Sequence, residues 1–399
     1  MSLKEEKMMI LTLIQDGKIT AQEAELLLNS LEAKPEETAD SYEGNHLMAK
    51  DLRAAFNAAS CEHWTDTKFK FKVQFDGQFY SASQVSSHDG NQNPHEEQVN
   101  LNLFTANGGI TLHGWDEPHY HVELEITANA DSFENAKKVA HNNIIINRND
   151  NLLFIDGRYF RSTNFQVNIV IWLPNHMQYA MNLVTSNGGI TQRNLYGKSI
   201  EASTSNGGID LINSHAKTIT ATTSNGGINL TNSQADTIDA TTCNGGINLT
   251  NSQADTIDAT TSNGGIGLKN VSALAVELAT LNGGISSDTG FKNFRAISSN
   301  GSIKAKTLAE GQTTCILATT NGSIDVELTG RPDLAIDLDL ETQKGRLITE
   351  LPEGALLDLP NDPKLKHIKA QTSDFTTYNH SLQLKVSTTT GSIRLIPKL

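Results

Sequence analysis

Residues 225–242 read NGGINLTNSQADTIDATT, and residues 244–261 repeat these letters without a change. The opening Asn-Gly-Gly-Ile word recurs along the chain at a spacing of 19 residues. Self-similarity at a period near 20 is typical of a solenoid, in which each repeat forms one coil of a stack. Looser copies follow at Asn300 and Asn321, where Ser replaces the second Gly, and a lone early copy begins at Asn107.

Each repeat alternates apolar and polar residues twice, over residues 228–231 and again over 237–241 in the quoted copy. This period of two predicts two short strands, separated by turns at Asn-Gly-Gly and at residues 232–233. We expect the Gly residues to supply positive φ in the first turn. The fold class is therefore predicted to be mainly β: a parallel β-solenoid, or β-helix, with rungs of about 19 residues.

Stacked coils lie about 4.8 Å apart, so the Asn of each word should lie above the Asn of its neighbour. Amide side chains stacked in this way form hydrogen-bonded ladders. We therefore expect a structural ladder along the first turn, made of Asn187, Asn206, Asn225, Asn244, Asn263, Asn282, Asn300 and Asn321.

Four segments are predicted along the chain. Residues 1–33 form a helical hairpin, 34–66 a linker and transitional segment, 67–98 capping strands with a loop, and 99–399 the solenoid. Helices as short as those of the hairpin bury little surface alone. We expect the hairpin to bind a protein partner or to self-associate, with packing on the solenoid as the alternative. Its apolar stripe consists of Ile10, Leu13, Ile14, Leu27, Leu28 and Leu31.

A strand with one basic face is predicted ahead of the solenoid, where Lys68, Lys70 and Lys72 alternate with apolar residues. These lysines could contact an anionic surface such as phospholipid headgroups. They could instead protect an exposed strand edge from pairing with another chain. Asp76-Gly77 predicts a hairpin turn after this strand.

Two segments are candidate caps for the ends of the stack. Asp131, with Glu134 three residues later, predicts the start of a short helix that runs through Ala140. The second candidate is a patch that contains Pro352, Pro360 and Pro363. Capped ends would keep the solenoid from joining end to end.

Composition narrows the class of protein. A formal net charge of −14 argues against sequence-independent nucleic-acid binding, which needs clustered cations. Cys61, Cys243 and Cys315 are far apart in the sequence, so reduced thiols are expected. Neither a signal peptide nor a transmembrane stretch is predicted. We expect a cytoplasmic protein, with peripheral contact to the cell envelope as an open alternative.

Motifs for chemistry are weak. Neither GxGxxG nor GxxxxGK[ST] occurs, and the repeat lacks the regular Asp of calcium-binding rolls. His119 and His121 share a strand face with His113 nearby, but a further metal ligand is not evident, so solvated histidines are the simpler interpretation. We predict no catalytic, cofactor-binding or metal-binding residues.

The repeat domain resembles a known bacterial family. TANGGITLHGWD at 105–116, VNIVIWLP at 167–174, the TSNGGI words and LQLKVSTTTGSIRLIPK at 382–398 resemble the "putative adhesin" β-strand-repeat family. The hairpin sequence EEKMMILTLIQDGKITAQEAELLLNSLEA resembles the segment ahead of this domain in YvlB-like proteins and in LiaX-type envelope-stress proteins of Gram-positive bacteria.

The resemblance implies a non-enzymatic binding or scaffold protein of the bacterial cell envelope, with the hairpin sensing or regulating envelope stress. One alternative is a self-assembling structural solenoid, joined end to end as in bactofilins. Another is a carbohydrate-active β-helix enzyme, which would need a carboxylate cluster on one face. The recurring Asp210, Asp239 and Asp258 are its candidates, although their repeat-equivalent spacing favours solvated rung residues.

Overall fold

The computed structural model describes residues 60–65, 68–78, 98–149, 151–158, 165–308, 310–329, 333–351, 357, 359 and 364–397. Ala54–Leu399 form a compact unit of their own. The predicted hairpin, with its apolar stripe, and the proline patch of Pro352, Pro360 and Pro363 lie outside the described residues. Within the described part of the chain, no helix is both long enough and apolar enough to cross a membrane.

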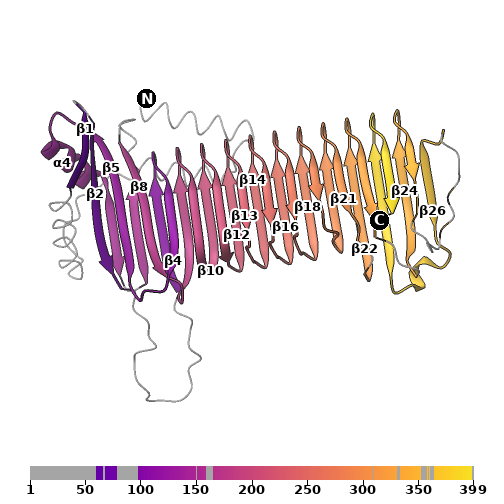
Figure 1. The fold of residues 1–399 in the computed structure, drawn as a ribbon, viewed down its shortest axis with the longest axis horizontal. Coiled ribbons are helices and arrows are strands. Elements are labelled where there is room, and N and C mark those ends of the chain that lie inside the picture. Colours follow the sequence, from indigo (N-terminus) through magenta and orange to yellow (C-terminus); the bar gives the residue numbers. More distant parts are fainter. Residues whose placement is uncertain are drawn as a thin grey trace, which may run out of the picture. The chain divides into compact units, whose positions relative to one another are not determined.

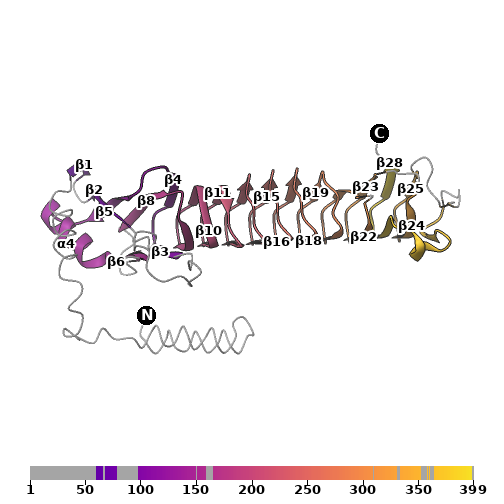
Figure 2. The ribbon, with the colours of Figure 1, turned by 90° about the horizontal axis from the view of Figure 1, so that it is seen from below.

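Two sheets form the two faces of a stack of coils (Figures 1 and 2). The first, sheet A, is parallel except at its beginning, where β2 and β5 run antiparallel to their neighbours. Its strands, in spatial order, are β1 (Ser60–Thr65), β2 (Lys68–Gly77), β5 (Tyr120–Asn129), β8 (Gln166–Pro174), β4 (Ile110–Trp115), the first half of β10 (Ile190–Thr204), β11 (Ile209–His215), β13 (Ile228–Thr231), β15 (Ile247–Thr250), β17 (Ile266–Lys269), β19 (Ile285–Ser287), β21 (Ile303–Lys306), β23 (Ile324–Leu328), β28 (Ile393–Pro397) and β25 (Leu347–Thr349).

Sheet B covers the other face, with antiparallel strands only at its two ends. Its order is β6 (Ile145–Asn149), β7 (Leu152–Gly157), β3 (Gln98–Thr105), β9 (Gln178–Thr185), the second half of β10, β12 (Thr218–Thr223), β14 (Thr237–Thr242), β16 (Thr256–Thr261), β18 (Ala275–Thr280), β20 (Asn293–Ser298), β22 (Gln312–Thr319), β27 (Ser381–Thr388), β24 (Ala335–Thr342) and β26 (His367–Gln371).

Equivalent residues of successive repeats pair directly. Ile209 lies beside Ile228, which lies beside Ile247, and all three side chains are buried between the sheets. Each rung gives one strand to each sheet, so its apolar residues become buried only against neighbouring rungs. The predicted mainly β, parallel β-solenoid fold is confirmed.

The first Gly of each word is required by close contact between rungs. A Cβ atom at Gly226 would lie 1.9 Å from the carbonyl oxygen of Gly207, and one at Gly245 would lie 1.8 Å from that of Gly226. Among the described glycines, only Gly108 and Gly311 have positive φ. The expectation that these glycines supply positive φ was therefore wrong, and their missing side chain matters instead.

Amide side chains line the turns. Asn206 Nδ2 donates to Asn187 Oδ1 at 2.8 Å, and Asn225 Nδ2 donates to Asn206 Oδ1 at 2.7 Å. The same bond continues through Asn244, Asn263, Asn282, Asn300 and Asn321. A second ladder lies at the other turn and was not predicted from the sequence. Its members have φ of 50° to 57°, a left-handed conformation that Asn tolerates. They are Asn194, Asn213, Asn232, Asn251 and Asn270.

Buried hydroxyls connect the rungs as well. Thr204 Oγ1 donates to the carbonyl of Gly188 in the preceding rung at 2.8 Å. The same contact recurs at Thr223, Thr242, Thr261 and Thr280. Each Asn-Gly-Gly turn is thus hydrogen-bonded to the preceding turn through the Thr two residues before its Asn, through the Asn side chain and through the backbone.

Two copies of the word belong to inserted rungs: the early copy at Asn107 and a degenerate last copy, Thr390-Gly391-Ser392-Ile393. Strands β3 and β4 lie between β7–β8 and β9–β10, so Asn107 accepts the Nδ2 hydrogen bond of Asn187 at 2.8 Å. Strands β27 and β28 lie between β22–β23 and β24–β25. There Thr390 Oγ1 donates to Asn321 Oδ1 at 3.3 Å and ends the ladder.

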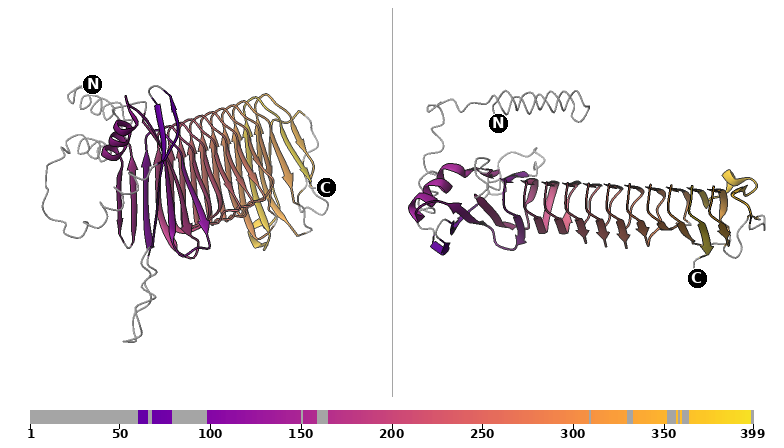
Figure 3. Two further views of the ribbon diagram at one scale, coloured as in Figure 1. Left: turned by 60° about the vertical axis from the view of Figure 1, so that its left-hand side comes forward. Right: turned by 90° about the horizontal axis from the view of Figure 1, so that it is seen from above.

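A helix and antiparallel strands complete the ends (Figure 3). Helix α4 (Phe133–Asn143) begins after Ser132, whose Oγ accepts from the backbone N–H of Asn135 at 3.3 Å. The predicted cap at Asp131 was one residue early, and the helix runs beyond Ala140. The ring of Phe133 packs on the rings of Phe69 and Phe71 in β2. At the other end β26 pairs antiparallel with β24, near the short helix η2 (Phe375–Thr377).

Strand β2 is not an edge at its lysines. It pairs with β1 on one side over residues 68–72 and with β5 on the other side over its whole length. The interpretation of the lysines as protection for an exposed edge was therefore wrong. The hairpin turn predicted at Asp76-Gly77 was also wrong, because both residues lie within strand β2 and pair with His121 and Tyr120 of β5.

We expect Gly245→Ala to lower the unfolding free energy by about 3 kcal/mol, because its methyl group would overlap the carbonyl of Gly226. Urea unfolding followed by circular dichroism measures the change. Gly267→Ala is the matched control, because its new Cβ would meet side-chain ends and no backbone: Asn248 Oδ1 at 3.1 Å and Ser286 Oγ at 3.8 Å. Equal losses in both variants would contradict the close-contact explanation.

We expect Asn244→Asp to cost about 1–2 kcal/mol, because a carboxylate oxygen would replace the donor that faces Asn225 Oδ1 at 2.7 Å. Thermal unfolding at neutral pH measures this loss. The control is Cys243→Ser, since Cys243 is exposed and other repeats carry Ser at its position. A neutral Asn244→Asp variant would show that the ladder contributes nothing to stability.

Candidate functional site: the outer face of the N-terminal cap

Five adjacent strands bring one outward-facing row of side chains together at the beginning of sheet A. The pairing registers place Asp76 of β2 beside His121 of β5, then Trp172 of β8, His113 of β4 and Arg193 of β10. Each residue comes from a different strand, and alternation along each strand turns all five away from the core. We call this set the cap row.

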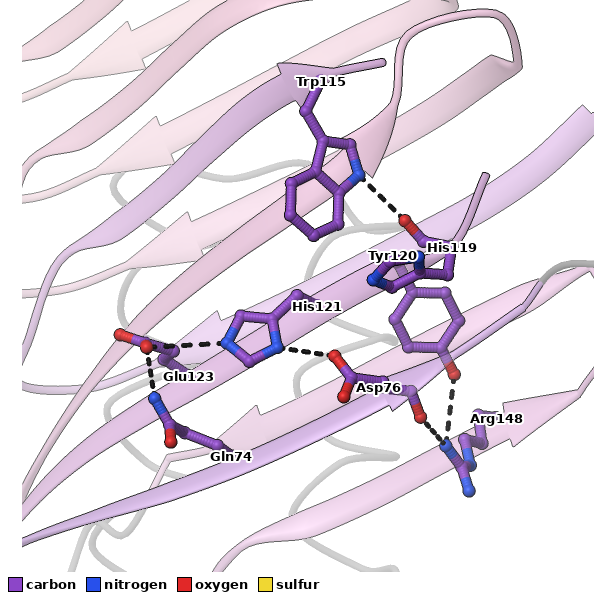
Figure 4. Close-up of polar contacts among 8 residues, drawn as sticks. All are labelled: Gln74, Asp76, Trp115, His119, Tyr120, His121, Glu123 and Arg148. Carbon is purple, nitrogen blue, oxygen red and sulfur yellow. Dashed lines mark hydrogen bonds and ion pairs between the residues drawn. The ribbon is translucent and has the colours of Figure 1, made fainter. Parts of the chain in front are cut away.

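Aromatic rings pack against one another along the cap row. The Trp172 ring lies between two imidazoles, 5.5 Å from His113 and 5.3 Å from His121 between ring centroids. Trp115, at the end of β4, lies 6.4 Å from Trp172 and 5.0 Å from His119. Trp115 Nε1 donates to the carbonyl of His119 at 2.8 Å, which fixes the indole on the surface (Figure 4).

His121 joins two carboxylates on neighbouring strands. Its Nδ1 lies 2.6 Å from Asp76 Oδ1, and its Nε2 lies 3.5 Å from Glu123 Oε1 (Figure 4). Glu123 also accepts from Lys72 Nζ at 3.3 Å and from the Gln74 amide. Burial alone would raise the pKa of Glu123, but these hydrogen bonds outweigh it and lower the pKa below its usual value.

Arg148 links this face to sheet B. It lies on β6 and donates from Nη1 to the backbone carbonyl of Asp76 at 2.9 Å and to the Tyr120 hydroxyl at 3.5 Å (Figure 4). Its guanidinium also lies over the ring of Phe75, 5.8 Å from the centroid. Burial raises the pKa of Tyr120, so its hydroxyl stays protonated at neutral pH. Both sheets therefore hold the end of β2 that carries Asp76.

The opposite end of the cap row differs in charge. Burial and the nearby Arg193 cation both lower the pKa of His113, which therefore stays uncharged at neutral pH. The row thus runs from a carboxylate, through two imidazoles and an indole, to a guanidinium. Such a surface offers hydrogen-bond donors, acceptors and aromatic area to a ligand.

The histidines singled out in the sequence lie on this face. Trp172 lies between His113 and His121, His119 packs on Trp115, and the two nitrogens of His121 face Asp76 and Glu123. Among the described residues, no group of three or more His, Cys, Asp or Glu side chains has a geometry that could hold a metal ion. Sequence reasoning missed Trp115 and Trp172, although indoles at outward positions of two strands were a usable signal.

The other predicted residues lie elsewhere. Lys68 and Lys70 are exposed on the same sheet face, and Lys72 forms an ion pair with Glu123. Asp210 lies in β11 of sheet A and accepts from Asn229, whereas Asp239 and Asp258 lie in sheet B. Asp239 and Asp258 are adjacent in register, with Glu277 of β18 beside Asp258, and burial together with these two carboxylates raises the pKa of Asp258. Asp210 lies on the other sheet, so the three predicted aspartates do not form one cluster.

The fold and this face define a capped parallel β-solenoid with a surface-exposed aromatic row. The family model described as "Toastrack DUF4097" matches residues 116–395, and the chain belongs to this family. A model described as "SHOCT-like domain" matches residues 5–36, over the predicted hairpin.

Three similar proteins share little sequence identity with this chain. "Uncharacterized protein YvlB" of Bacillus subtilis strain 168 is 26% identical over 50% of this chain and 57% of its own length, so the match spans less than two thirds of that relative. Among solved structures, a "putative adhesin" from Parabacteroides merdae is 12% identical over 64% of this chain and 89% of that one, with a TM-score of 0.36. A "putative cell adhesion protein" from Clostridium sporogenes is also 12% identical, over 82% and 100%, with a TM-score of 0.20. At these sequence identities and TM-scores, no function can be assigned to this chain from these proteins.

We expect Glu123→Gln to flatten the pH dependence of stability below about pH 5. A carboxyl whose pKa is lowered by folding stabilises the protein above its unfolded pKa, and this stabilisation is lost as pH falls through the folded pKa. Urea unfolding at pH 3 to 7 measures the slope. Glu125→Gln, at the next outward position of β5, should keep the slope of the unmodified protein. The same slope in all three proteins would show that Glu123 does not cause the pH dependence of stability.

Proposed function

We propose that this chain is a non-enzymatic binding protein that acts peripherally at the bacterial cell envelope. The solenoid is its rigid scaffold, the cap row contacts the ligand, and the hairpin recruits a partner protein that regulates the response to envelope stress. The observation that carries the proposal is the cap row, where five strands bring ionic and aromatic side chains together on one outward face.

Comparison with the regular rungs supports this place for the binding surface. Along β13 and β15 the outward residues are the same pair, Asn and Thr, and the Asn side chains bond to each other. On the cap these neutral polar residues give way to tryptophan, histidine and charged groups. The regular rungs stack with Asn and Thr at these outward positions, so stacking does not require the tryptophan, histidine and charged residues of the cap. These residues can instead contact a ligand.

The role of the hairpin rests on its sequence. Its apolar stripe, defined above from Ile10 to Leu31, is long enough to pair with a second amphipathic helix. The stripe overlaps the segment matched by the SHOCT-like model. A partner protein or a second copy of the hairpin would bury the stripe. The solenoid would not be needed for that contact and could bind at the envelope.

The structure offers less support for an end-to-end polymer. An antiparallel strand, β26, lies at one end of sheet B, and the antiparallel strand β6 lies at the other. At the β6 end, helix α4 packs on β2 through Phe133 and also contacts β5. A parallel coil of a second molecule would have to continue across strands of opposite direction, so we do not propose a polymer.

We expect the protein in native cells to move from the soluble to the membrane or wall fraction after treatment with a membrane-active antibiotic. The double variant Trp115→Ala/Trp172→Ala should remain soluble, whereas Tyr196→Ala should behave as the unmodified protein, since Tyr196 is an exposed aromatic residue outside the cap row. Immunoblots of the fractions measure the distribution. An unmodified protein that stays soluble under challenge would overturn the envelope assignment.

A variant in the hairpin separates its proposed role from that of the cap. We expect Leu27→Asp/Leu28→Asp to keep the shift to the envelope fraction but to lose the partner in affinity purification from crosslinked cells. Loss of the envelope shift in this variant would instead assign envelope contact to the hairpin.

A further inference from the structure

Both ends of the cap row carry hydrogen-bonding groups that the protein itself does not use. The Asp76 side chain is 64% exposed and uses one carboxylate oxygen, Oδ1, to contact His121 at 2.6 Å. Its Oδ2 has no hydrogen-bond partner among the described residues. Arg193 is exposed at the other end, and within the described ranges its guanidinium makes neither a hydrogen bond nor an ion pair. One end of the row therefore offers an acceptor, and the other end offers several donors.

His113, next to Arg193 in the row, can both donate and accept. Burial and the Arg193 cation lower its pKa, so at neutral pH the imidazole is uncharged and has one N–H group and one lone pair. In the part of the chain that the structure describes, His113 contacts Trp172 through its ring and makes no hydrogen bond. A ligand that meets an acceptor, a donor and an imidazole along one line must itself carry donors and acceptors. Hydroxyl groups have both.

Trp115 adds a partly exposed apolar face beside the row. Its Nε1 donates to the carbonyl of His119 at 2.8 Å, which holds the indole in place (Figure 4). The rings of Trp172, His119 and His121 contact it at interplanar angles of 39° to 65°, so none of these three rings stacks flat on it. The face of an indole carries partial negative charge and attracts the polarised C–H groups of a sugar ring.

The charges around the row favour a neutral ligand. Asp76 and Glu123 already have partners, His121 at 2.6 Å and Lys72 at 3.3 Å, and a cationic ligand would have to displace them. The segment after β4 adds two exposed carboxylates, at residues 116 and 117, which repel an anion. A molecule with many hydroxyl groups and no net charge meets both conditions.

We propose that the cap row and Trp115 bind a neutral oligosaccharide. Sugar hydroxyls hydrogen-bond with Asp76, His113 and Arg193, and one sugar ring stacks on Trp115. From β2 to β10 the row crosses four strand intervals, which amount to roughly 19 Å, so it accommodates several sugar units in line. The inference rests on the proposed function, in which the cap row contacts the ligand, and it specifies the class of that ligand.

The first test is an NMR titration of the full chain with three neutral hexasaccharides, the β-1,4-linked hexamers of N-acetylglucosamine, glucose and mannose. We expect saturable shifts of the Trp115 and Trp172 indole N–H signals with at least one of them. Trp115→Ala should weaken binding about tenfold, because the stacking face is lost. The control Tyr196→Ala removes an exposed aromatic residue outside the row and should bind within about twofold of the unmodified protein. No saturable shift with any hexamer, or equal losses in the two variants, would overturn the proposal.

A second pair of variants tests the hydrogen bonds without disturbing the rings. Arg193→Gln and Lys198→Gln each remove one exposed cation from β10, and neither side chain is paired with another described residue. We expect Arg193→Gln to weaken hexamer binding about fivefold, because a hydrogen bond from a charged donor is lost. Lys198→Gln should leave the affinity unchanged. Equal affinities in the two variants would contradict the proposed site.

The charge of the ligand is tested with an acidic analogue, the hexamer of galacturonic acid. We expect it to bind more weakly than the neutral hexamer that binds best, because the carboxylates at residues 116 and 117 repel it. Tighter binding of the acidic hexamer would overturn the assignment of a neutral ligand.

This inference and the envelope assignment fail separately. Hexamer binding by a protein that stays in the soluble fraction after antibiotic treatment would support the oligosaccharide site and overturn the envelope assignment. A shift to the envelope fraction that is lost in Trp115→Ala/Trp172→Ala, without binding of any hexamer, would overturn the oligosaccharide site and keep the envelope assignment.

Discussion

The contact between the first Gly of one word and the carbonyl of the same Gly in the preceding word governs this structure. With less than 2 Å between that oxygen and any added Cβ at Gly226 or Gly245, successive turns can stack directly only if both residues are Gly. The Asn ladder, the buried Thr hydroxyls and the strand pairs all follow from this stacking. The stacking tolerates changes of length between the words, because the ladder bond is kept between Asn282 and Asn300, 18 residues apart, and between Asn300 and Asn321, 21 residues apart.

Regular stacking has a consequence for function. Rungs that share one sequence present the same outward side chains, and those side chains bond to each other along the ladder. Side chains of different chemistry therefore occur where the sequence departs from the repeat. The cap row departs from it by bringing a tryptophan and two histidines together on the outer face.

The sequence predicted the interior of the fold better than its ends. The period and the alternation of residues 225–261 were enough for a parallel β-solenoid, because stacking of identical rungs is a nearest-neighbour problem. The cap row could not be predicted in this way. Its members Asp76, Trp172 and Arg193 are distant in sequence. The antiparallel placement of β5 between β2 and β8 brings Asp76 and Trp172 beside His121, and the insertion of β4 between β8 and β10 brings Trp172 and Arg193 beside His113.

By itself, then, the sequence determined the rung, its 19-residue period and the residues of the first Asn ladder, since all three depend on local alternation and on contacts between adjacent copies. Only the tertiary structure decided where the irregular copies at Asn107 and Thr390 go. Both are inserted one rung inside an end of the stack. The physical reason is that an end rung has a neighbouring rung on one side only. Its other side is covered by segments distant in the sequence, through burial and long-range strand pairing, and the repeat does not encode these contacts.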